Sequence, residues 1–184
     1  RRDFFDREKE IEELKDVIEH KDFAAVLGIR RIGKTSLVKV TLSELPDHMA
    51  LTVNLGRLGS RGSYPMEAFS KLFLEGASEL IRRHTFAGRV SKIIANRLGV
   101  DPEDVVELNW AKIGIKLREF RTEDVNEVVR ALDSIARDNK KGLVVFLDEV
   151  QNVKKVKGFD LGSFLHDVYE WCEDTVVVVS GSIV

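Results

Sequence analysis

The chain has 184 residues, a formal net charge of −2 and 43 % hydrophobic residues, a composition that suits one domain with a full apolar core. The near-neutral charge gives no general attraction to nucleic acid, and no apolar run approaches the roughly 18 residues that a membrane-spanning helix needs. The single cysteine, Cys172, excludes an internal disulfide, so we expect a cytoplasmic protein with no membrane partner.

Hydrophobic periodicity predicts helices that alternate with short apolar strands, the pattern of an α/β fold. The expected strands are residues 23–27, 49–55, 110–117, 143–147 and 175–182. The expected helices are residues 7–20, 34–45, 65–83, 88–98, 123–139 and 160–172, with a further helical turn from 101–102 and a mobile loop at 56–63. The strand at 110–117 rests on alternation, with Ile113, Ile115 and Leu117 on one face and Lys112 and Lys116 on the other.

The run from Gly28 to Thr35 matches G-x-x-x-x-G-K-[ST], the phosphate-binding loop, and it lies between an expected strand and an expected helix. The two glycines allow the backbone to fold closely around a phosphate, whose charge the loop N–H groups and the helix N-terminus stabilise. We expect Lys34 to reach the β- and γ-phosphates of ATP and Thr35 to bind Mg²⁺. The expected nucleotide contacts in this segment are Gly28, Ile29, Arg30, Arg31, Ile32, Gly33, Lys34, Thr35 and Ser36.

Two carboxylates follow the apolar run 143–147. A strand that is apolar on both faces belongs inside a parallel sheet, and ligands bind at the carboxyl ends of such strands. Asp148 is therefore expected to hold Mg²⁺, and Glu149 to accept a proton from the attacking water. Taken alone, the pair is more often the start of a solvated loop; together with the phosphate loop, it favours a site.

The strand-like run 175–182 ends in Ser180, Gly181 and Ser182. In the same sheet, this end would lie beside the phosphate loop, where Ser180 or Ser182 would hydrogen-bond the γ-phosphate or the water. The alternative is a plain strand end followed by a turn. We assign catalytic roles to Glu149, Lys34 and Ser180.

The chain resembles archaeal ATPases of the AAA+ group, which are close to Orc/Cdc6-type and STAND-type nucleotide switches. The resemblance is carried by Phe4–Glu10 followed by Ile11 and Leu14, by Gly28–Leu37, by Phe146–Gln151 and by Ser180–Ser182. It implies a P-loop NTPase fold of three layers, α/β/α, with strand order 5-1-4-3-2, and it places Phe4, Phe5 and Asp6 near the adenine. Phe5 and Asp6 complete the expected cofactor contacts.

The domain expected from the resemblance is a nucleotide-binding domain over residues 1–184, with a helical insertion at 56–120 between the second and third core strands. The fifth strand, the C-terminal lid and the winged helix of such proteins have no counterpart in this sequence. The family's arginine finger and sensor-2 arginine cannot be placed either, and the oligomeric state stays open. A DNA or protein partner would bind through those missing parts.

The leading hypothesis is Mg²⁺-dependent hydrolysis of ATP to ADP and phosphate. The alternative is a nucleotide-gated switch or initiator-like DNA-binding protein with slow hydrolysis, whose candidate basic surfaces are Arg82–His84 with Arg89 and Lys92, and Lys154–Lys157. A small-molecule kinase is less favoured, because a glutamate next to Asp148 suits activation of water. GTP is disfavoured, because Asn139–Gly142 lacks the aspartate of the guanine-reading N-K-x-D motif.

Overall fold

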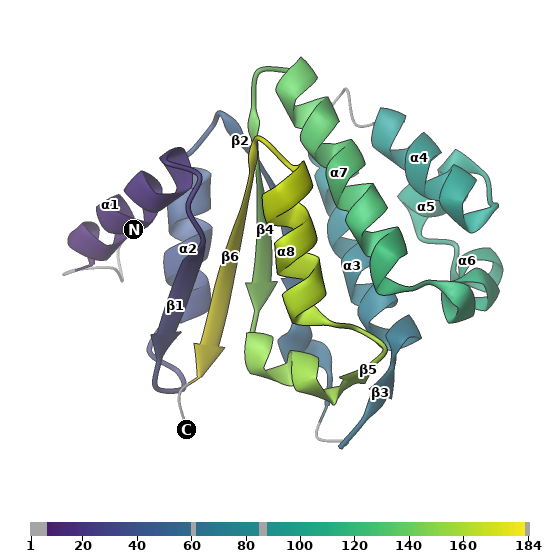
Figure 1. Cartoon of the computed structure of the whole chain (residues 1–184), viewed down its shortest axis with the longest axis horizontal. Coiled ribbons are helices and arrows are strands. Elements are labelled where there is room, and N and C mark those ends of the chain that lie inside the picture. The colour runs from purple at the N-terminus through teal and green to yellow at the C-terminus, as the bar shows by residue number, and fades with distance from the viewer. Residues whose placement is uncertain (1–6, 60–61, 85–87, 183–184) are drawn as a thin grey trace.

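Four parallel strands form the centre of the fold, and their carboxyl ends point to the same side (Figure 1). The computed structural model describes residues 7–59, 62–84 and 88–182. The sheet has the order β1-β6-β4-β2, which reads 1-4-3-2 when the four strands are numbered along the chain. The strands are β1 (Ala24–Gly28), β2 (His48–Asn54), β4 (Gly142–Asp148) and β6 (Thr175–Ser182). The prediction of an α/β fold with a parallel sheet is confirmed.

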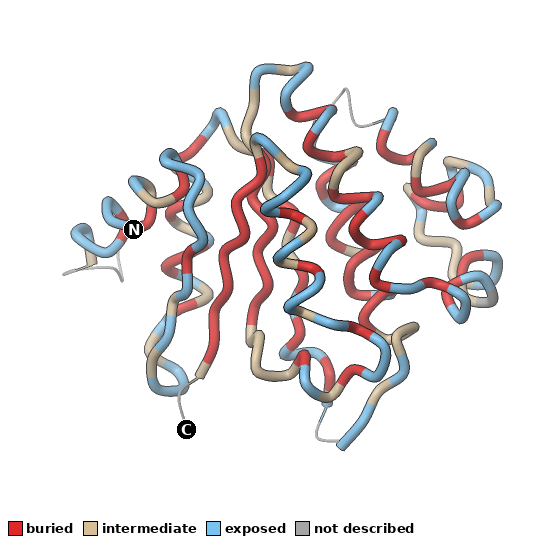
Figure 2. Tube along the Cα trace, in the orientation of Figure 1, coloured by how far each residue is buried: buried red, intermediate tan, exposed pale blue. Residues whose placement is uncertain are grey.

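The sheet is covered by helices on both faces, and the central strands β4 and β6 are buried along almost their whole length (Figure 2). In β4, Val144 and Phe146 pack into the apolar cluster that includes residues of α1 (Glu8–Glu19) and α2 (Lys34–Ser43). Leu143, Val145 and Leu147 alternate with them and pack into the larger cluster, which includes residues of α3 (Met66–Arg83), α7 (Thr122–Asp138) and α8 (Leu161–Trp171). An uninterrupted apolar run is therefore what this position in the sheet requires.

Most of the expected helices form close to their predicted bounds. The helices are α1 (Glu8–Glu19), α2 (Lys34–Ser43), α3 (Met66–Arg83), α4 (Gly88–Leu98), α5 (Pro102–Glu107), α6 (Trp110–Lys116), α7 (Thr122–Asp138) and α8 (Leu161–Trp171). No helix in the described part of the chain is long and apolar enough to cross a membrane.

The predicted strand at 110–117 is wrong, because this segment is helix α6 followed by the 3-10 turn η3 (Leu117–Glu119). Ile113 and Leu117 are both fully buried, and their spacing of four residues fits a helix face as well as a strand face. Figure 1 places α6 among helices, away from the four-stranded sheet. With no described strand beside it to pair with, the segment satisfies its backbone groups within a helix.

The segment between β2 and α7 divides into two parts. Helix α3 packs directly on β2, whereas α4 packs against α5 and α7. In Figure 1, helices α4, α5 and α6 lie to the right of the layer that covers the sheet. The assignment of residues 56–120 as an insertion stays a prediction.

A small two-stranded parallel sheet, absent from the sequence-based expectations, links two segments that follow β2 and β4. It pairs β3 (Tyr64–Pro65) with β5 (Val156–Lys157), which comes after the 3-10 turn η4 (Val150–Lys155). The expected mobile loop at 56–63 instead begins as the 3-10 turn η1 (Leu55–Arg57), where Arg57 forms an ion pair with Glu75 of α3. Residues 60–61 of that loop lie outside the description.

The contact between α3 and β2 depends on Gly76. A Cβ atom there would lie 2.2 Å from the carbonyl oxygen of Thr52, which is too close for any real contact. We expect Gly76→Ala to lower the free energy of unfolding by about 1–3 kcal/mol, because the helix must move away from the strand. Urea denaturation measures the change. Gly114→Ala is the control: its Cβ meets nothing within 4 Å, so stability stays unchanged or rises by about 0.5–1 kcal/mol.

Candidate functional site

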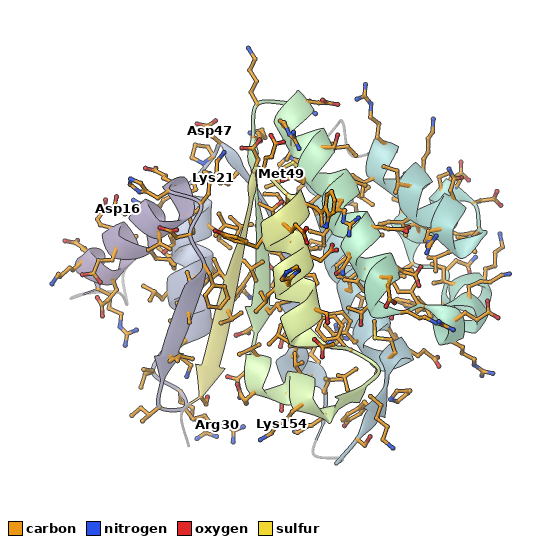
Figure 3. All side chains as sticks on the ribbon, viewed as in Figure 1. Asp16, Lys21, Arg30, Asp47, Met49 and Lys154 are labelled. Atoms are coloured by element: carbon orange, nitrogen blue, oxygen red, sulfur yellow. The ribbon has the colours of Figure 1, made fainter. Side chains whose placement is uncertain are left out.

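The predicted site residues meet at the carboxyl ends of β1, β4 and β6. Gly28 at the end of β1 is in register with Ser182 of β6, and Leu147 of β4 is in register with Val179. The phosphate loop, Asp148 and the end of β6 are therefore neighbours, as expected at this edge of an open parallel sheet. In Figure 3, Arg30 of the loop and Lys154 of η4 both lie at this end of the molecule.

The phosphate loop turns sharply so that α2 begins at Lys34. Gly33 has a φ of +83° and Arg31 a φ of +69°, so the loop uses the left-handed region twice. At Gly28, a Cβ would lie 2.6 Å from Cδ1 of Ile32, so a larger residue there would require the Ile32 side chain to move. The first N–H groups of α2 have no partner within the helix and carry the positive end of its dipole. This arrangement suits an anion.

Lys34 is buried, with 5 % of its surface exposed. Its ammonium group donates to the carbonyl oxygens of Gly28 (3.1 Å) and Ile29 (2.8 Å) and to the hydroxyl of Ser182 (3.3 Å). Among the described residues, no carboxylate is within salt-bridge distance of Lys34. The lysine is a buried cation held only by neutral acceptors, and a phosphate would supply the missing negative charge.

Asp148 is the opposite case, a buried carboxylate with 4 % of its surface exposed. Its oxygens accept from the Thr35 hydroxyl, at 2.9 and 3.1 Å, and from the hydroxyl of Ser180. No described lysine or arginine forms an ion pair with it. Carboxylate and hydroxyl oxygens are hard ligands that fit Mg²⁺, which usually takes one or two protein oxygens and fills its other positions with phosphate and water. The donor set therefore fits the predicted ion.

Ser180 is fully buried beneath this pair. Its hydroxyl donates to Oδ1 of Asp148 and accepts from the backbone N–H of Glu149 at 3.2 Å. Ser182 lies two residues further along β6, and its hydroxyl accepts a hydrogen bond from Lys34 instead. Of the two serines, Ser182 lies on the lysine side of the site and Ser180 lies on the carboxylate side.

Glu149 adopts a left-handed backbone conformation with φ +58° and ψ +47°. A non-glycine residue in this region carries strain of about 1 kcal/mol or more, and such residues cluster at functional sites. Its carboxylate accepts from the side-chain amide of Gln151. Sequence reasoning assigned no role to Gln151, although its position two residues after Glu149 was the available signal.

The remaining predicted contacts occupy the surface of the loop or lie beyond the description. Ile29, Arg30 and Arg31 are exposed, Ile32 is half-buried, and Ser36 is exposed in the first turn of α2. Phe5 and Asp6 lie outside the described residues, so their expected contact with adenine stays a prediction.

The parallel sheet, the glycine loop before α2 and the buried lysine and aspartate define a P-loop ATPase domain. The chain belongs to the ATPase_2 family, described as an ATPase domain predominantly from Archaea, whose model matches residues 4–182. The resemblance to archaeal ATPases noted from the sequence is thereby confirmed. No curated protein sequence matches the chain.

Several solved structures share the fold, among them a Walker-type ATPase and an ORC2 protein. The Walker-type ATPase PABY2304 of Pyrococcus abyssi is 21 % identical with a TM-score of 0.58, and the similarity covers 98 % of this chain and 46 % of that one. The ORC2 protein of Aeropyrum pernix, solved in ADPNP–ADP complexes, is 16 % identical with a TM-score of 0.55, covering 96 % of this chain and 41 % of that one. This chain thus spans less than half the length of either structure.

The hydroxyl of Ser180 links Asp148 to Glu149, so its removal should weaken this edge of the sheet. Ser180→Ala leaves the half-buried Glu149 N–H without its acceptor and the buried Asp148 carboxylate with one donor fewer. We expect it to lower the free energy of unfolding by about 1–3 kcal/mol, measured by urea denaturation. Ser43→Ala removes an exposed hydroxyl that donates to the Val40 carbonyl and should change stability by less than about 0.5 kcal/mol. Equal effects of the two substitutions would contradict the assignment.

Proposed function

We propose that this domain binds ATP together with Mg²⁺ and hydrolyses it to ADP and phosphate. One observation carries the proposal: Lys34 and Asp148 are buried charges of opposite sign at the same sheet edge, and neither has an ionic partner among the described residues. Burying such charges is costly unless something compensates them. Magnesium triphosphate supplies both a negative group for the lysine and a cation for the aspartate.

The binding roles follow from the position of each group. Backbone N–H groups of the loop and of the first turn of α2 surround the phosphates, and Lys34 leaves its carbonyl acceptors to reach the β- and γ-phosphates. Thr35 and Asp148 are the residues that would hold Mg²⁺, and the ion would neutralise charge on the phosphates. Phe5 and Asp6 are proposed to lie against the adenine.

Glu149 is proposed as the general base for hydrolysis. The oxygen of a water molecule forms a bond to the γ-phosphorus, the bond from that phosphorus to the bridging oxygen of ADP breaks, and the proton of the water passes to the Glu149 carboxylate. Ser180 holds Asp148 and the backbone of Glu149 in place through its hydroxyl. The Ser182 hydroxyl accepts from Lys34, so it would lose this hydrogen bond when Lys34 moves to the phosphates. Of these two serines, we therefore propose Ser182 as the one nearer the γ-phosphate.

We propose that the nucleotide carries adenine rather than guanine as its nucleobase. The ORC2 structure that shares this fold is described in complexes with ADPNP and ADP, both adenine nucleotides. The segment Asn139–Gly142 also lacks the aspartate that reads guanine in the N-K-x-D motif.

The alternative of an initiator-like DNA-binding switch gains less support from the first of its two candidate basic surfaces, Arg82–His84 with Arg89 and Lys92. Arg83 forms an ion pair with Glu79, and Arg89 lies 3.4 Å from the Asp138 carboxylate. Carboxylates so placed reduce the attraction of these arginines for DNA phosphates. Hydrolysis of ATP remains the function that the site supports best.

Glu149→Gln tests the proposal, because the amide keeps the shape of the side chain but cannot accept the proton. We expect kcat to fall by about 100-fold or more while the Kd for ATP stays within about threefold. Phosphate release measures the first quantity and calorimetric titration the second.

Glu19→Gln is the matched control for this experiment. Glu19 is exposed at the end of α1, beside the start of β2 and thus at the opposite end of the sheet. It should leave both quantities unchanged. If Glu149→Gln hydrolysed ATP at the wild-type rate, the assignment of the general base would be wrong.

A further inference from the structure

Gln151 uses both ends of its side-chain amide within the site. It lies in η4, and its Nε2 donates to Oε2 of Glu149. Its Oε1 accepts from the backbone N–H of Ser182 at 3.2 Å. Because a backbone N–H can only donate, the carbonyl end of the amide must face Ser182, and the NH₂ end must face Glu149. The orientation of the amide is therefore fixed by its partners.

The Glu149 side chain is confined from a second direction by η1. A Cβ atom on Gly56 would lie 3.3 Å from Cγ of Glu149, so the stem of the glutamate passes close to the Gly56 backbone. Gly56 is itself held in place, since its N–H donates to the side chain of Asn54 at the end of β2. Gly56 lies beside the stem and Gln151 donates to one carboxylate oxygen. The other oxygen, Oε1, accepts no hydrogen bond from the residues that the structure describes, and it is therefore the oxygen that could accept from a water molecule.

The contact of Gln151 with Ser182 extends this arrangement to the phosphate loop. The Ser182 hydroxyl accepts from Lys34, while the Ser182 backbone N–H donates to Gln151. Hydrogen bonds therefore connect Lys34 to Ser182, Ser182 to Gln151 and Gln151 to Glu149. On the proposed binding of ATP, Lys34 turns toward the phosphates and releases Ser182. Gln151 thus connects the end of β6 to the proposed general base, because its side-chain amide bonds both Ser182 and Glu149.

We propose that Gln151 is a positioning residue for ATP hydrolysis, which orients the Glu149 carboxylate toward water and ties that orientation to the end of β6. This inference rests on the proposed ATPase function. It concerns a residue that is proposed to touch neither the nucleotide nor the reacting atoms, and to affect hydrolysis through Glu149. Its removal should therefore affect turnover but leave ATP binding unchanged.

The first experiment compares kcat and the Kd for ATP in the wild type and in Gln151→Met, which keeps a similar volume without the amide. We expect kcat to fall by about 10- to 100-fold, because the base loses its orientation, and the Kd to change by less than about threefold. Circular dichroism on heating shows whether the variant folds. Gln151→Asn, which keeps a shorter amide, is the second variant and should retain more activity than Gln151→Met.

A double-mutant cycle separates positioning from a general structural effect. In the Glu149→Gln background, measured by single turnover with radiolabelled ATP, adding Gln151→Met should change the rate by less than about twofold. The same fold loss in both backgrounds would mean that Gln151 does not act through Glu149, and would overturn the inference.

A wild-type protein without any ATP turnover would refute the proposed function and this inference together, whereas wild-type turnover with an equally active Gln151→Met would refute this inference only.

Discussion

The burial of two unpaired charges at one edge of a parallel sheet is the constraint on which the site depends. Lys34 and Asp148 are each about nineteen-twentieths buried, yet each is held only by neutral groups among the described residues. The apolar strands β4 and β6 and the helices on both faces keep these groups in place. The free energy that packing contributes offsets the cost of burying the charges, and a ligand that carries both opposite charges would remove that cost.

Two non-glycine residues at this edge have left-handed backbone conformations. Arg31 lies in the phosphate loop and Glu149 lies directly after β4; other described residues with positive φ, such as Lys21 and Leu108, lie elsewhere in the fold. Such conformations persist because surrounding contacts determine them, here the hydrogen bonds from the Glu149 backbone to Ser180 and from Gln151 to the Glu149 carboxylate.

Much of this could be predicted from the sequence, because the loop motif and the two-sided apolar strands are local patterns. The motif placed Lys34 and Thr35, and the apolar run before Asp148 placed that carboxylate at the sheet edge. The helix at Trp110–Lys116 was missed because residues four apart share a face in a helix and in a strand. The contacts of Gln151 were missed for a different reason: they depend on how the turn η4 lies against the end of β6, which no local pattern encodes.

The most direct test of the account is calorimetric titration of the protein with ATP, with and without Mg²⁺, in the wild type and in Lys34→Ala. The account predicts saturable binding that Mg²⁺ strengthens and that Lys34→Ala weakens by about 10- to 100-fold, since the lysine contributes a charge-assisted contact to the phosphates. Equal affinity in the wild type and a folded Lys34→Ala would contradict it, as would a folded wild type that does not bind ATP.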